Sequence, residues 1–144
     1  MTGAPARGRA LARVGLAGNP SDLYGGAVVA MAIDSFATTV TVDPGGPWEL
    51  PADGRSLLEA TIARFTAHTG LAPTPGRVSI ETSVPRQSGL AGSSAIVIGL
   101  LRALAAERST HLTAFDLAAM ALAVEADDLG MVAGAQDRVA QAYE

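Results

Sequence analysis

The sequence predicts an α+β domain, a two-layer structure in which helices pack on one face of a mainly antiparallel sheet. Strand-like segments outnumber helical ones before Asp43, whereas three helix-like segments follow Asp43 with one clear strand between them. Repeating βαβ units would instead alternate the two kinds of segment along the chain. With 144 residues, 49% of them hydrophobic, the chain can bury one core, so we expect one domain.

The first part of the chain carries the strand signals. After about nine loose residues, strand-like runs are expected over 10–17, 27–33 and 36–42. Between the first two lies Gly18 to Gly26, which is rich in residues that reverse the chain. From Asp43 to Gly54, proline and glycine indicate a surface connection. We expect Trp48 there to be a packing residue rather than a base-stacking aromatic.

Two helices are marked by their ends. The pattern Ser56-x-x-Glu59 predicts a capping box, and Gly70 predicts the end of the same helix. Thr113-x-x-Asp116 predicts the start of a later helix. Its expected apolar stripe includes Phe115, Ala119 and Leu122.

A strand, a glycine loop and a third helix lie between these two helices. Alternation over 78–84 predicts the strand, and helical spacing of apolar residues begins at Ala95. Gly89 and Gly92 allow the backbone to approach a ligand closely. The free amides of the helix start, opened by Ser93 and Ser94, favour negative charge. The pattern indicates an anion site, and phosphate is the usual anion at such a site.

Three common glycine motifs do not fit this loop. A P-loop requires a lysine, and the chain has none. The dinucleotide fingerprint fails because Gly89 and Gly92 have no third glycine in register before Gly99, inside the predicted helix. The hydrolase elbow G-x-S-x-G fails because Ser93 is followed by serine and alanine.

The loop P-R-Q-S-G-L-A-G-S-S-A, over 85–95, resembles the phosphate loop of the GHMP kinases, the family of galactokinase, homoserine kinase and mevalonate kinase. It has one extra residue before the serine pair. G-N-P-S-D-L-Y-G-G, over 18–26, resembles the substrate-binding turn of that family, and A-G-A-Q-D-R-V-A-Q, over 133–141, resembles its later acidic segment. The wording of all three is nearest to the glucuronokinases. The resemblance implies the ribosomal-protein-like fold of the N-terminal domain of GHMP kinases.

The resemblance also implies ATP and Mg²⁺ as cofactors and a sugar or sugar acid as substrate. Within that family, we expect phosphorylation of the anomeric hydroxyl of a uronic acid. Asp137 is the expected base or orienting group, and Arg13 is expected to keep it ionised. The expected nucleotide-binding residues are Pro85, Gly89, Leu90, Ala91, Gly92, Ser93, Ser94 and Ala95. Substrate contacts are expected from Asn19, Asp22 and Arg86, the last to a phosphate or a uronate carboxylate.

Metal ligation is expected from Ser94 and Glu125 by the same resemblance. Independently, Glu125, Asp127 and Asp128 cluster at the end of a predicted helix, where the helix dipole disfavours negative charge. At least one of these acids is therefore a candidate for a functional role, while Asp127 and Asp128 fit a solvated turn equally well.

Composition excludes several classes of function. A net charge of −4 with scattered arginines argues against a nucleic-acid surface. The chain has no cysteine, so disulfides and thiolate metal sites are excluded. Its two histidines, His68 and His111, lack ligand-like spacing, which argues against metal binding by imidazole. No apolar run reaches the ~18 residues of a membrane span, so we expect a cytoplasmic protein.

The third GHMP motif, a glycine-rich loop of the C-terminal domain, has no counterpart in these 144 residues. We therefore expect residues 1–144 to be the N-terminal, ATP-binding domain, with the second domain missing or on a separate chain. Three alternatives stay open: a nucleotide- or sugar-binding remnant without turnover, a GHMP kinase for galactose, mevalonate or homoserine, and a small structural domain whose apolar surface meets a partner.

Overall fold

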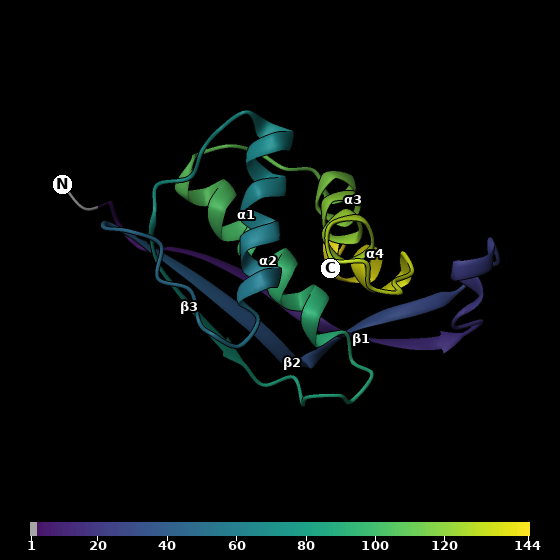
Figure 1. The fold of residues 1–144 in the computed structure, drawn as a ribbon. Helices are drawn as coiled ribbons and strands as arrows, with labels where there is room; N and C mark the ends of the chain where they lie inside the picture. The colour runs from purple at the N-terminus through teal and green to yellow at the C-terminus, as the bar shows by residue number, and fades with distance from the viewer. Residues whose placement is uncertain (1–2) are drawn as a thin grey trace.

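The computed structural model describes residues 3–144, and in it helices cover one face of an antiparallel sheet (Figure 1). The predicted α+β class is confirmed. The elements are β1 (Ala6–Ala17), the 3₁₀ helix η1 (Ser21–Tyr24), β2 (Val29–Pro44), α1 (Arg55–Thr69), β3 (Gly76–Thr82), α2 (Gly92–Glu107), α3 (Ala114–Ala123), the π-helix η2 (Val124–Asp128) and α4 (Gln136–Ala142).

The sheet has the order β1-β2-β3, and both pairs are antiparallel. The two strands predicted over 27–33 and 36–42 are one long strand, β2. In its pairing with β1, Leu11 lies opposite Ala37 and Ala12 lies opposite Ile33, so residues 34–36 bulge out of the register. The bulge interrupts the alternation that the sequence pattern detects. Beyond it, β1 and β2 continue as a two-stranded arm that carries η1 at its tip (Figure 1), and Asp22 of η1 contacts Gln136 at the start of α4.

Strand β1 begins at Ala6 rather than at residue 10, so the expected loose N-terminal segment is shorter; residues 1 and 2 lie outside the described part. The first five residues of β1, A-R-G-R-A over 6–10, have little β-propensity. Its small residues have a packing role, because α2 lies directly on them. A Cβ on Gly8 would come within 2.6 Å of the Ala103 amide nitrogen. The tertiary contact with α2 therefore determines this part of the strand.

Helix α2 is the centre of the core, between the sheet and the other helices (Figure 1). Buried residues, most of them apolar, lie on nearly every side of α2, as expected for a helix that other elements surround. Its buried residues are Ser94, Ala95, Val97, Ile98, Gly99, Leu100, Leu101, Ala103, Leu104 and Ala105. Trp48 is partly buried against this core, as predicted for a packing residue.

Helix ends agree only in part with the sequence patterns. The Thr113–Asp116 capping box is present, and Gly70 ends α1 in the left-handed conformation. The box predicted at Ser56 is wrong, because α1 begins at Arg55 after Gly54, and this puts Ser56 inside the first turn.

The apolar stripe predicted for α3 is also wrong. Phe115 is 70% exposed, and the residues that face the core are Leu117, Ala118, Met120 and Ala121. Nearly every residue of α3 is apolar, so its spacing alone does not select a face. No helix within residues 3–144 is long and apolar enough to cross a membrane.

Candidate active site

The glycine loop that precedes α2 has an unusual backbone. Gln87, Gly89 and Ala91 have positive φ angles of 52°, 73° and 61°. The left-handed conformation is strained for Ala91, and such strain is concentrated at functional sites. The first backbone hydrogen bond of α2 runs from Ala95 N to Ala91 O at 3.1 Å. The amides of residues 92–94 therefore have no helical acceptor and are available to an anion.

Neither serine caps the helix, since α2 begins at Gly92 and has no side-chain cap. Ser93 and Ser94 lie in the first turn instead. Ser94 is fully buried, and its hydroxyl donates to Ala91 O at 3.3 Å. The predicted free amides are in place, but the predicted role of the serines in opening the helix is wrong.

Two buried polar residues donate hydrogen bonds to backbone carbonyls of the loop. Arg13 on β1 donates its backbone N–H to Leu90 O at 3.1 Å. Gln141 on α4 is fully buried, and its Nε2 donates to Leu11 O at 2.9 Å and to Ala91 O at 3.0 Å. Gln141 thus joins α4, β1 and the strained residue of the loop. Sequence reasoning missed it, because a glutamine on a short helix carries no signal of burial.

A large pocket of about 940 Å³ lies along the loop. Residues 85–93 line it on one side, and Arg13, Ser93 and Asp137 are also in its lining. Its apolar walls come from Leu57, Ile80, Val84 and Ile96. Exposed Arg86 pairs with exposed Asp53, which also lines this pocket. The pocket combines free amides with apolar walls, an arrangement that suits a nucleotide.

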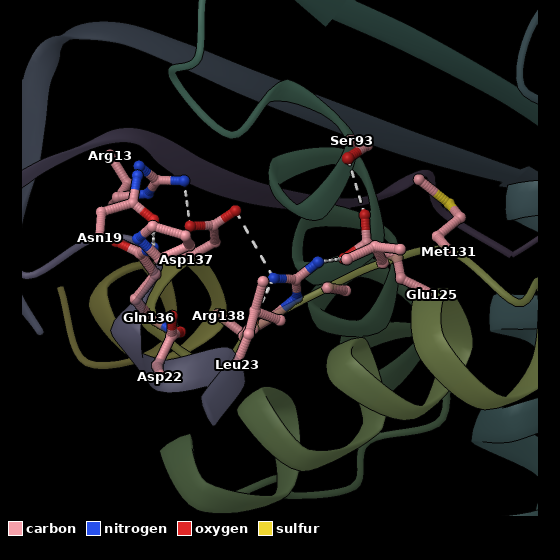
Figure 2. A pocket seen from close by; sticks show the side chains of 14 residues that line it. Arg13, Asn19, Asp22, Leu23, Ser93, Glu125, Met131, Gln136, Asp137 and Arg138 are labelled. Carbon is pink, nitrogen blue, oxygen red and sulfur yellow. Dashed lines mark hydrogen bonds and ion pairs between the residues drawn. The ribbon is translucent and has the colours of Figure 1, made fainter. Parts of the chain in front are cut away.

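Charged side chains form a continuous row beside this pocket (Figure 2). Asp137 pairs with Arg13 on one side, and its other oxygen lies 3.5 Å from Arg138 NH1. Arg138 in turn donates to Glu125, whose other oxygen accepts a hydrogen bond from Ser93 Oγ at 2.7 Å. Arg13, Glu125 and Arg138 are each less than 10% exposed. Opposite charges alternate along the row, so each buried charge has a partner.

A second, smaller pocket of about 230 Å³ lies along the row. Asp22 Oδ2 accepts a hydrogen bond from Gln136 N at 3.1 Å, and Asn19 Oδ1 accepts one from Gln136 Nε2. Within residues 3–144, four buried polar atoms of the lining have neither a hydrogen-bond partner nor an ion-pair partner: Arg13 Nε, Asp22 Oδ1, Gln136 Oε1 and Arg138 Nε. Buried polar atoms without a partner are rare in folded proteins, and a functional role is one explanation for them. Sequence reasoning missed Gln136, although it adjoins the predicted Asp137.

The pKa of Asp137 is raised above its ordinary value, because burial disfavours the charged carboxylate. Arg13 and Arg138 lower this pKa, but their effect is the smaller one. The expectation that Arg13 keeps Asp137 ionised is therefore only half right. The direction of the pKa shift moves the carboxyl towards the range of a base that exchanges protons.

The hydroxyl beside Glu125 is that of Ser93, and this corrects the predicted pairing of Ser94 with Glu125. Ser94 lines neither pocket, whereas Ser93 lines both. The Ser93 and Glu125 oxygens are 2.7 Å apart, and neighbouring ligands around Mg²⁺ are about 3 Å apart at bond lengths of ~2.1 Å. This pair fits two positions of a magnesium site. Residues 3–144 hold no group of three or more His, Cys, Asp or Glu side chains suited to a metal, so Ser93 and Glu125 would need further ligands of other kinds.

The structure brings Arg13, Ser93, Glu125 and Asp137 together, with Asn19 and Asp22 at the small pocket. Arg86 lines the large pocket and not the small one, so its predicted contact with a uronate carboxylate has no support in this geometry. Asp128 pairs with Arg64 at 2.5 Å, and Asp127 is exposed, which agrees with a solvated turn at these two acids.

The sequence and the fold of this chain both match those of known proteins. The family model for the GHMP kinases N terminal domain matches residues 56–144. The chain is 30% identical to Glucuronokinase 1 of Arabidopsis thaliana over 94% of its length, and 40% identical over 62% of its length to a D-glycero-alpha-D-manno-heptose 7-phosphate kinase of Campylobacter jejuni. It spans 46% of that glucuronokinase and 25% of that heptose kinase. The fold matches the mevalonate kinase of Methanococcus jannaschii with a TM-score of 0.83 at 20% identity, over 99% of this chain and 52% of that one.

Proposed function

We propose that this chain, which belongs to the GHMP kinase family, binds ATP in the large pocket and a sugar in the small one, as part of an ATP-dependent sugar kinase. The observation that carries the proposal is that the two pockets share Arg13, Ser93 and Asp137. Transfer between two bound substrates requires such a meeting point, because the donor phosphorus and the acceptor oxygen must be held in contact. The volumes of about 940 and 230 Å³ suit a large donor and a small acceptor.

On the donor side, the amides of residues 92–94 would bind the nucleotide phosphates, with the dipole of α2 directed at them. The apolar walls leave room for the base. When Mg²⁺ is bound, it neutralises charge on the phosphates; Ser93 and Glu125 are the side chains that would hold it. The chain has no lysine, so its other cations at the site are arginines.

On the acceptor side, Asp22, Asn19 and Gln136 would hold sugar hydroxyls, because their side chains line the small pocket and Asp22 Oδ1 and Gln136 Oε1 lack protein partners. Asp137 lies where the two pockets meet and would accept or orient the proton of the attacking hydroxyl. Arg13 would offset the negative charge that develops there. As the acceptor we propose a uronic acid, phosphorylated at its anomeric hydroxyl, because all three motifs resemble those of glucuronokinases and the chain is 30% identical to one.

The experiment measures phosphate transfer from ATP to glucuronate, galactose, mevalonate and homoserine. It uses the chain alone and the chain joined to the part of a glucuronokinase that lies beyond the match. Preferential phosphorylation of glucuronate supports the proposal. A better rate with a neutral sugar or another alcohol would retain the kinase and reject the uronate. Binding of ATP or sugar without transfer in either form would favour the non-catalytic alternative.

A further inference from the structure

We propose that Arg138 neutralises the Glu125 carboxylate when no metal ion is bound, so that the guanidinium and Mg²⁺ compete for the charge of this carboxylate. The inference rests on the proposed function in one respect, which is that Ser93 and Glu125 form the metal site. It goes further by assigning a role to Arg138, which lies in the segment 133–141 but has no role in the family resemblance or in the proposed transfer step.

The first observation is the burial of the pair. Glu125 has no solvent exposure, and Arg138 is 4% exposed. Arg138 NH2 donates to Glu125 Oε2 in a buried contact, and Ser93 holds Oε1. An ionised carboxylate in such a position needs a partner cation or a metal ion. Without metal, Arg138 is the cation that meets this need.

The second observation is the geometry of Arg138 itself (Figure 2). Its NH1 donates to Gly134 O and lies 3.5 Å from Asp137 Oδ2, while its Nε has no partner among the described residues. One guanidinium thus bridges the two carboxylates of the row and the loop that leads into α4. A metal ion bound at Ser93 and Glu125 would place a second positive charge beside it, so the two cations oppose each other.

The third observation is the charge balance of the small pocket. Its lining contains three carboxylates and two guanidinium groups. Removing the charge of Arg138 leaves three carboxylates against Arg13. A buried pair that loses one partner is strongly destabilised, and a cation that binds the folded chain alone restores stability. The chain without Arg138 should therefore depend on a divalent metal for its stability.

The test is the thermal melting of the full chain with MgCl₂ or MnCl₂ and no nucleotide or sugar, against NaCl at equal ionic strength. The variants are Arg138→Gln, Arg138→Lys as the charge-retaining control, and Arg108→Gln as an exposed-arginine control. We expect Mg²⁺ to raise the melting temperature of Arg138→Gln by at least about 5 °C, and to change that of wild type and both controls by less than about 1 °C. The double variant Arg138→Gln/Glu125→Gln should lose the response.

An equal response of wild type and Arg138→Gln would overturn the inference, as would a full response of the double variant. If Arg138→Gln is unfolded without metal, folding on addition of Mg²⁺ or Mn²⁺ supports the inference, and failure to fold with either metal contradicts it. Because nucleotide and sugar are absent, the outcome does not depend on transfer. A chain that shows this metal response but no phosphate transfer would reject the proposed function and leave the competition intact.

Discussion

The two pockets that meet at Arg13, Ser93 and Asp137 are built from different parts of the protein. The large pocket presents backbone amides and apolar walls, and nine of its 19 lining residues form the contiguous stretch 85–93. The small pocket presents charged and amide side chains from β1, the turn after it, η2 and α4. The first can bind an anion without any titrating group, whereas the second holds the groups that can move a proton. Binding and chemistry are thus separable by mutation.

The largest effect is expected for Asp137→Asn. Loss of a general base lowers a transfer rate by about 10²–10⁴-fold, while nucleotide affinity should change by less than about twofold because the amides of residues 92–94 stay in place. Transfer assays and nucleotide titration measure the two effects. Asp127→Asn, at an exposed position, is the matched control. An equal loss of nucleotide affinity in Asp137→Asn would show that the two pockets do not act separately.

The next largest effects are expected from replacing two glutamines, Gln141 behind the glycine loop of the large pocket and Gln136 in the small pocket. Gln141→Leu leaves the Leu11 and Ala91 carbonyls without their side-chain donor, so we expect about 1–3 kcal/mol of lost stability and weaker nucleotide binding. Gln136→Leu should weaken sugar binding and leave nucleotide binding unchanged, because Gln136 lines the small pocket alone. Denaturant unfolding and separate titrations with ATP and sugar measure these changes. The opposite pairing of effects would contradict the assignment of the pockets.

A smaller effect is expected in the pH dependence of the small pocket. The raised pKa of Asp137 means that transfer should fall as pH decreases through that value, since the protonated carboxyl is no base. Arg13 opposes the shift, so Arg13→Gln should raise the pKa further and move the acid limb of the pH–rate profile to higher pH. A move to lower pH would contradict this balance.

The raised pKa of Asp137 also makes the stability of the folded chain depend on pH. Above the ordinary value of 3.8, folded Asp137 retains a proton that the unfolded chain has lost. Its contribution to stability therefore falls as pH rises from that value through the raised pKa. Asp137→Asn should lack this fall, which unfolding curves at several pH values can measure.

The smallest effect is expected for Arg86→Ala. The Arg86–Asp53 pair is exposed, so its loss should change stability by less than about 1 kcal/mol. Because Arg86 lines the large pocket alone, the ratio of glucuronate to galactose turnover should not change. A selective loss of glucuronate turnover would restore the predicted carboxylate contact and break the division between the pockets.

The sequence by itself predicted the α+β class, the glycine loop and its free amides, because these depend on short-range patterns: alternation, helical spacing, and glycine in a contiguous loop. It also selected Arg13, Glu125 and Asp137, through a family resemblance that itself rests on short contiguous motifs. It missed the length of β1, whose small residues gain their role from α2, and the apolar face of α3, which only the packing of the other helices selects.

The tertiary structure alone decided which side chains meet. Ser93 and Ser94 are neighbours in the same motif, yet a rotation of about 100° per helical residue turns one towards Glu125 and the other into the core. Gln141 and Arg138 lie on one short helix, and their contacts reach the loop 50 residues away and Glu125 13 residues away. Burial and charge pairing at such distances follow from how elements pack, and a linear pattern contains no record of that packing.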